Sequence, residues 1–149
     1  MDVELVRQRL ADAVKAGVVL PDVDLQTFGY VPDQVDPPCF YTAEVEIDPN
    51  IVFGPKDQFI LRCRVLTSTQ DDKAGQQMLD RLLRRKGPTS IRKVFHEQRG
   101  GPGVLALGGA ADTLNLQKID GYRLYKIGVD NYFGAEFRIL IIGDGEEDT

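Results

Sequence analysis

The sequence predicts an α+β protein. We expect one domain over residues 1–149, with a mostly antiparallel or mixed sheet of about five or six strands packed against two or three helices. The prediction depends on period-two alternation from Phe59 to Val65, on helical spacing of apolar residues just after it, and on further alternating segments toward both ends. At 149 residues and 16.6 kDa, the chain is long enough to bury one hydrophobic core.

The segment from Asp57 to Lys86 is the unit against which the rest is expected to pack. Its strand should turn Arg62 and Arg64 outward and four apolar side chains inward: Phe59, Leu61, Cys63 and Val65. Thr69 or Ser68 can cap the helix that follows, with Asp71 and Asp72 at its positive end. Arg84, Arg85 and Lys86 fall at its negative end, and its apolar stripe comprises Ala74, Met78, Leu79, Leu82 and Leu83.

The N-terminal part is expected to supply one helix and two strands. The helix runs from about Asp2 to Ala16, with Val3, Val6, Leu10 and Val14 at helical spacing, and Gly17 ends it. A short strand follows at Asp24–Val31, and the prolines of VPDQVDPP then stiffen the connection. In a second strand at Phe40–Ile47, we expect Tyr41, Ala43, Val45 and Ile47 to point inward and the strand to pair with the one at Asp57.

Between these strands, two turn sequences bracket Ile51, Val52 and Phe53. One interpretation is a bulge whose apolar side chains close one end of the core. The other is a projecting loop whose apolar tip inserts into a partner. Apolar residues are usually buried within their own chain, and this favours the first interpretation slightly.

The C-terminal part is expected to be a short helix and a meander. Thr89 or Ser90 caps a helix that ends at Arg99 and holds Ile91, Val94 and Phe95. An Asp120-Gly121 turn then joins strands at Thr113–Ile119 and Tyr122–Gly128. That turn would place Leu116 opposite Tyr125, Leu114 opposite Ile127 and Lys118 opposite Arg123. A central strand follows at Tyr132–Ile142, and the acidic tail, residues 143–149, is expected to fray.

Composition excludes several classes of protein. A net charge of −5 and a pI near 4.9 argue against a dedicated nucleic-acid binder. No apolar run approaches the roughly 18 residues that a membrane span needs, and MDVELVRQRL does not resemble a secretory signal. We expect Cys39 and Cys63 to be reduced thiols in a protein made in a cytoplasm.

The sequence contains no set of residues that indicates catalysis, so we expect no enzyme activity, cofactor or metal. His96 is the one histidine and has no ligand partners at metal-site spacing. Neither cysteine has an evident activating base. The glycine-rich stretch RGGPGVLALGGAADT lacks the Gly-Lys-Ser/Thr of a phosphate loop.

Positive charge nevertheless gathers between residues 81 and 99. The cluster consists of Arg81, Arg84, Arg85, Lys86, Arg92, Lys93, His96 and Arg99. A solvated face near helix C-termini explains part of it. A contact with an acidic protein or with passing nucleic acid is the functional alternative. Because no aromatic residues interleave the cations, we favour the protein contact or the solvated face.

Several motifs, in order, resemble the tail terminator proteins of long, non-contractile-tailed (siphovirus-type) bacteriophages, particularly those of actinobacteria. The similar stretches are Tyr30-Val31-Pro32-Asp33 with Pro37-Pro38, Val52-Phe53-Gly54, the strand ILRCRVLTS with its helix, Leu107-Gly108-Gly109, and Tyr132-Phe133-Gly134-Ala135-Glu136-Phe137. Each motif is short, and their succession and spacing carry the resemblance. The RGGPG joint and the acidic tail depart from the family pattern.

The resemblance implies a structural virion protein. Such proteins form a homohexameric ring that caps the tail tube, ends its polymerisation and offers the interface for head joining. The implied partners are further copies of the chain, the major tail tube protein and the head–tail connector or stopper proteins. Genomic DNA would pass the lumen without specific recognition. We expect the interface to use Ile51, Val52, Phe53, Arg81, Arg84, Arg85, Arg92, Lys93, Tyr132 and Phe133.

Two alternatives stay open. The first is another head–tail joining protein, such as a head completion or stopper protein. The second is a small accessory protein that binds nucleic acid through residues 81–99.

Overall fold

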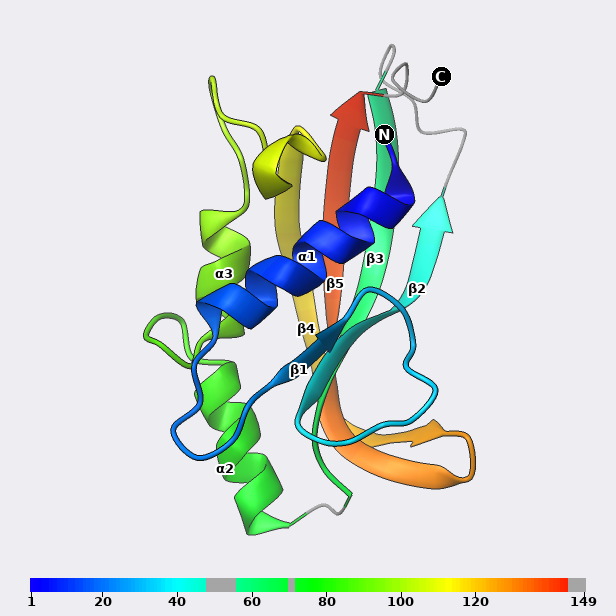
Figure 1. Ribbon diagram of the computed structural model, residues 1–149, viewed down its shortest axis with the longest axis vertical. Helices are drawn as coiled ribbons and strands as arrows, with labels where there is room; N and C mark the ends of the chain where they lie inside the picture. Colours follow the sequence, from blue (N-terminus) through cyan, green and yellow to red (C-terminus); the bar gives the residue numbers. More distant parts are fainter. Residues whose placement is uncertain (48–55, 70–71, 145–149) are drawn as a thin grey trace.

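A five-stranded sheet forms the centre of the computed structural model, which describes residues 1–47, 56–69 and 72–144 (Figure 1). From edge to edge, the strands are β1 (Gln26–Phe28), β2 (Cys39–Ile47), β3 (Lys56–Ser68), β5 (Asp130–Asp144) and β4 (Thr113–Ile127). β1 and β2 are parallel, and all other neighbours are antiparallel. The predicted α+β class is confirmed, as is the pairing of the second strand with the third.

Three α-helices pack on one side of this sheet. They are α1 (Val3–Gly17), α2 (Lys73–Leu82) and α3 (Ile91–Glu97), and a short 3₁₀ turn, η1, spans Leu107–Gly109. Figure 1 shows α1 crossing the front of the sheet, with α2 and α3 along its left side. None of the helices in the described part of the chain is long and apolar enough to span a membrane.

α1 forms where the sequence predicts it, but Gly17 has a different role. The Asp2 carboxylate caps the helix by accepting the Leu5 N–H, and Val6, Leu10 and Val14 are buried. Gly17 lies inside the last turn of α1. A β-carbon there would stand 2.5 Å from Cγ2 of Val94, so this glycine lets α1 approach α3 closely.

The main core lies between the helices and the sheet. Phe40, Phe95 and Phe137 meet at its centre, with ring centroids 5.4–6.2 Å apart. The predicted inward face of β3 is confirmed, because Phe59, Leu61, Cys63 and Val65 are all buried in this core. Burying one such large apolar side chain stabilises the fold by roughly 1.5–3 kcal/mol.

The predicted boundaries of the α2 helix are wrong at both ends. β3 continues to Ser68, which pairs with Phe133, and the N-cap is Asp72, whose side chain accepts the Gly75 N–H at 2.7 Å. The helix ends at Leu82, so the residues from Arg84 to Lys86 belong to the linker before α3. Leu79 and Leu82 are buried as expected, whereas Ala74 is exposed.

β2 departs from simple alternation because it contains a bulge. Its register with β3 shifts between Thr42 and Glu44, and an extra residue in a strand moves the following side chains to the other face. As a result, Tyr41 and Val45 do not share a face. Thr42 is buried beside Cys63, and Ile47, predicted to point inward, is 56% exposed.

The predicted Asp120-Gly121 hairpin turn is also wrong. β4 runs without interruption from Thr113 to Ile127, and Gly128 and Val129 make the turn to β5. Leu116 therefore lies opposite Ile139, and Lys118 lies opposite Arg138. Asp120-Gly121 instead sits at a bulge, where the register shifts between Asp120 and Arg123. This turn-prone sequence thus marks an irregularity inside a long strand.

The far half of the β4–β5 hairpin curls around the sheet edge toward the start of β2 (Figure 1). It builds a second apolar cluster on the face opposite α1, comprising Cys39, Tyr41, Leu66, Tyr125 and Tyr132. The upper half of the same face carries charged side chains instead. The sheet is consequently covered on one face by helices and on the other by its own hairpin and a charged surface.

Candidate interaction surfaces

A cationic groove runs between α3 and the first half of β4. We call it the basic groove; it has a volume of about 590 Å³ and is lined by Arg85, Lys86, Arg92, Lys93, Phe95, His96, Arg99, Gly100, Leu114, Asn115 and Leu116. Phe95 and Leu114 are almost fully buried and form its apolar floor. Five lysine and arginine side chains with a histidine surround that floor, so the groove is suited to an anionic partner.

Local hydrogen bonds explain why these cations converge. Ser90 caps α3 through the Lys93 N–H and also donates its hydroxyl to the Arg84 carbonyl, which fixes the linker that carries Arg85 and Lys86. On α3, Arg92 donates to the Leu83 carbonyl at 3.4 Å, and Lys93 donates to the Gly17 carbonyl at 3.1 Å. Bonds to neutral carbonyls hold the side chains in place without neutralising their charge.

The structure gathers part of the sequence-predicted basic cluster. Arg85, Arg92 and Lys93 line the groove together with Lys86, His96 and Arg99. Arg81 and Arg84 do not line it; their carbonyls accept hydrogen bonds from Thr89 and Ser90. The far wall and part of the floor come from β4, and no pattern in residues 81–99 could indicate which strand lies beside α3.

A second surface has the opposite charge. The segment 29–38, here called the acidic loop, joins β1 to β2 and exposes Asp33 and Asp36. Beside Asp33 lies a shallow groove of about 530 Å³, where Tyr30 and Val31 are each about half exposed. None of the predicted interface residues belongs to this surface, although the sequence contains a signal for it: residues 16–55 contain neither lysine nor arginine.

Arg7 of α1 holds the acidic loop in shape. Its guanidinium donates to the Gly29 carbonyl at 2.6 Å and to the Thr42 carbonyl at 3.2 Å, and lies 3.9 Å from the centre of the Tyr30 ring. The loop is therefore anchored to both α1 and β2. A preformed loop loses less conformational entropy on binding than a free one.

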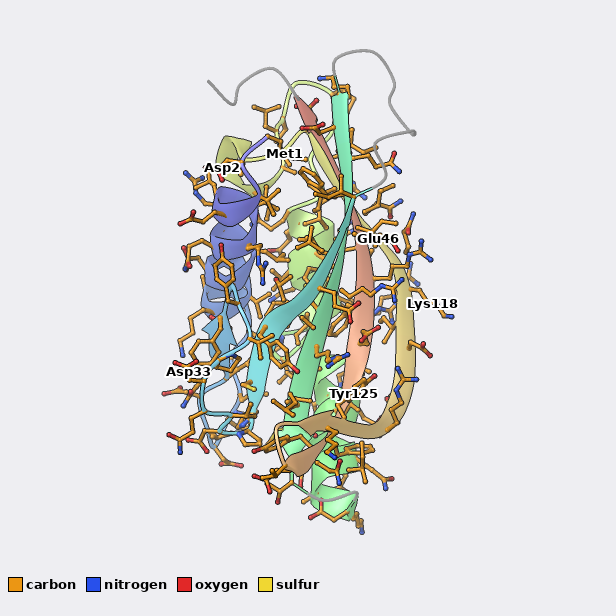
Figure 2. The ribbon with its side chains drawn as sticks, turned by 90° about the vertical axis from the view of Figure 1, so that its right-hand side faces the viewer. Met1, Asp2, Asp33, Glu46, Lys118 and Tyr125 are labelled. Atoms are coloured by element: carbon orange, nitrogen blue, oxygen red, sulfur yellow. The ribbon has the colours of Figure 1, made fainter. Side chains whose placement is uncertain are left out.

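The charged half of the sheet face is a third surface. Arg138 on β5 pairs in register with Arg62 on β3 and with Lys118 on β4, which makes a row of three cations. Figure 2 shows Glu46 and Lys118 on this face. Glu46 lies 3.7 Å from Arg62, and Glu136 binds Arg64 at 2.9 Å, so acidic groups border the row on two sides.

Two of the predicted interface residues are buried. Tyr132 is 8% exposed and belongs to the second cluster, and Phe133 is 1% exposed and belongs to the main core. Their burial argues against direct contact with a partner and assigns them to packing. Ile51, Val52 and Phe53 lie outside the described residues.

Cys39 and Cys63 are buried free thiols, and His96 is exposed. Burial raises the pKa of Cys63 to about 12, and burial together with the Asp36 charge raises the pKa of Cys39 to about 12. Both thiols are therefore protonated and weakly nucleophilic. His96 Nδ1 accepts from Arg99 at 3.2 Å. Across the ranges 1–47, 56–69 and 72–144, no three His, Cys, Asp or Glu side chains group as metal ligands.

Comparison with known proteins gives no match to a family model, and no curated protein matches the chain.

Proposed function

We propose that this protein is a structural virion protein: a tail terminator of a long, non-contractile-tailed phage. Copies of the chain form a hexameric ring that caps the tail tube, ends its polymerisation and offers the interface for joining the head. The ordered motifs that resemble this family support the proposal. The α+β fold is compatible with it, and among those motifs Tyr30, Val31 and Asp33 line the groove on the acidic loop.

The observation that carries the proposal is the difference between the two edges of one subunit. Residues 81–99 hold seven lysines and arginines with one acidic residue, and they adjoin β4 at one edge of the sheet. The acidic loop lies at the other edge, between β1 and β2. Closed rings with more than two subunits need heterologous contacts, in which two different patches of each subunit match. A cationic groove cannot pair favourably with a copy of itself.

Capping then follows from surface complementarity. One face of the ring resembles the tube's own interface closely enough to bind the tube end, and the opposite face cannot accept another tube ring. The segment Ile51-Val52-Phe53 is the proposed contact with the tube or an adjacent subunit, because apolar residues there stand between two turn sequences. Changing Val52 and Phe53 to Asp should leave the protein folded by circular dichroism but abolish attachment to tubes. Unfolding, or normal attachment, contradicts this assignment.

Electron microscopy of particles assembled without this gene tests the function as a whole. Overlong or polydisperse headless tails beside filled heads are the expected result, because tube growth would lack its stop. Tails of normal length that fail to attach, or heads that leak DNA, would favour the head completion or stopper alternative. Intact infectious particles would overturn the structural role.

A further inference from the structure

We infer that the acidic loop of one copy of this chain seats in the basic groove of the next, and that this head-to-tail contact closes the ring. The inference rests on the proposed function for the number of copies. It adds the two surfaces that meet and the chemistry by which they recognise each other.

In a single chain, no acidic side chain among the lining residues balances the positive charge of the basic groove. Arg85 and Lys86 on the linker and Arg99 after α3 are all exposed, and they face a common space with Arg92 and Lys93. Because like charges that converge repel each other, an anionic occupant lowers the free energy of the assembly. Leu116 on β4, which is only partly buried, adds apolar area that a purely polar ligand would not use.

The loop side has matching properties. Asp33 and Asp36 supply two carboxylates, and Tyr30 and Val31, 49% and 47% exposed, supply apolar area next to them. Residues 29–38 contain no lysine or arginine to offset these charges. The contacts from Arg7 fix the loop before any partner arrives, which reduces the ordering cost.

The positions of the two surfaces favour contact between chains. The acidic loop lies at the right of Figure 1 and α3 at the left. Separate surfaces of opposite charge on opposite edges leave each copy with one free groove and one free loop. Repetition of that contact gives a ring if the rotation closes.

The groove favours a polypeptide over nucleic acid. β4 lies at the sheet edge, and Leu114 directs its N–H away from β5 to the Arg99 carbonyl. By strand alternation, the backbone groups of Leu116 also point away from β5, where a polypeptide can hydrogen-bond to them. The aromatic side chain in the groove, Phe95, is 1% exposed and cannot stack on a base.

Charge exchange between two variants tests the contact directly. The groove variant carries Arg85→Glu, Lys86→Glu and Arg99→Glu, which changes the charge of the five groove cations from +5 to −1, and the loop variant carries Asp33→Lys and Asp36→Lys. Each has repulsive surfaces when alone, so we expect at least a tenfold loss in self-association, measured by sedimentation velocity and native mass spectrometry. An equimolar mixture restores both attractive contacts and should give rings of alternating composition.

Matched controls separate this effect from net charge. Lys73→Glu, Arg81→Glu and Lys126→Glu together change the net charge equally at three exposed residues outside the groove. Glu4→Lys with Asp12→Lys does the same for the loop variant on α1, where both residues are exposed. Both controls should assemble like the parent protein, and circular dichroism should show every variant folded. Assembly should weaken between about 0.1 M and about 1 M salt, where the Debye length falls from ~10 Å to ~3 Å.

Four results would overturn the inference: a parent protein that stays monomeric at low salt, a variant that assembles alone, a mixture that fails to recover, or controls that lose assembly equally. If the groove variant loses only its affinity for a thymidine oligonucleotide, the groove is a nucleic-acid site instead. These measurements use purified protein and do not depend on the phage experiment. Failure of the contact and failure of the tail-terminator role are therefore distinguishable.

Discussion

Gly134 on β5 faces Val65 on β3 so closely that a β-carbon at Gly134 would stand 2.0 Å from the Val65 carbonyl oxygen. The Leu66–Gly134 pair lies just before the register shift in β3, where the β4–β5 hairpin begins to curl. A side chain at this position would push the two strands apart. Glycine is therefore required here by the close approach of two backbones.

Gly134→Ala should destabilise the fold by about 2–4 kcal/mol, because the added methyl meets backbone, which cannot move away as a flexible side chain can. Denaturant unfolding monitored by circular dichroism measures the loss. Gly101→Ala is the control, since a β-carbon at Gly101 has nothing within 4 Å and should change stability by less than about 0.5 kcal/mol. Equal effects of the two substitutions would contradict the steric explanation.

Arg138→Glu should stabilise the protein. Arg138 lies between Arg62 and Lys118, so the substitution turns two repulsive cross-strand pairs into attractive ones, each worth about 0.2–1 kcal/mol. The midpoint of urea unfolding should rise. Added salt screens repulsion in the parent and attraction in the variant, so the advantage should shrink as salt increases. If Arg138→Glu is no more stable than the parent protein at low salt, the row of cations does not destabilise the folded state.

Asp72→Ala should cost about 1 kcal/mol, because it removes the carboxylate that accepts the Gly75 N–H at the start of α2. Thr69→Ala is the matched control, since Thr69 precedes the helix and is not its cap. Thermal unfolding compares the two. A larger loss for Thr69→Ala would restore the cap position that the sequence pattern predicts.

Tyr41→Phe should leave stability unchanged or raise it by up to about 1 kcal/mol. The Tyr41 hydroxyl is buried beside the Arg64 guanidinium, but among the residues described it makes no hydrogen bond of good geometry, and Arg64 binds Glu136 instead. Removing an unsatisfied buried hydroxyl relieves its desolvation cost. Tyr122→Phe is the comparison, because the Tyr122 hydroxyl donates to Asp80 at 2.5 Å and its removal loses a bond. A clear loss for Tyr41→Phe would reveal a partner for that hydroxyl.

Stability should fall as the pH rises above about 9. Burial raises the pKa of both thiols from 9.0 to about 12, so the folded chain keeps two protons that the unfolded chain releases between these values. The contribution is complete below the unfolded pKa and is lost as the pH approaches the folded one. Replacing Cys39 and Cys63 by Ala should flatten this dependence in urea titrations. Rapid alkylation of the native thiols near neutral pH would contradict their burial.

Local sequence signals predicted the elements better than their ends. The Ser90 cap of α3 and the alternation through β3 involve neighbours in sequence, so the pattern contains the physical cause. The bulge near Thr42 and the long β4 escaped prediction because both depend on partner strands. An Asp-Gly pair suits a tight turn and a bulge equally well, and only the neighbouring β5 decides between them.

The order of residues was enough to predict the α+β class, the main strand with its inward face, and a basic cluster on an acidic chain. Packing of α3 against β4 selects which cations share a groove, because the far wall comes from Leu114, Asn115 and Leu116, which are distant from α3 in sequence. It also buried Tyr132 and Phe133 and displayed Asp33 and Asp36 at the opposite edge. Charge and alternation are local properties of a chain, whereas a surface is made by segments that packing alone brings together.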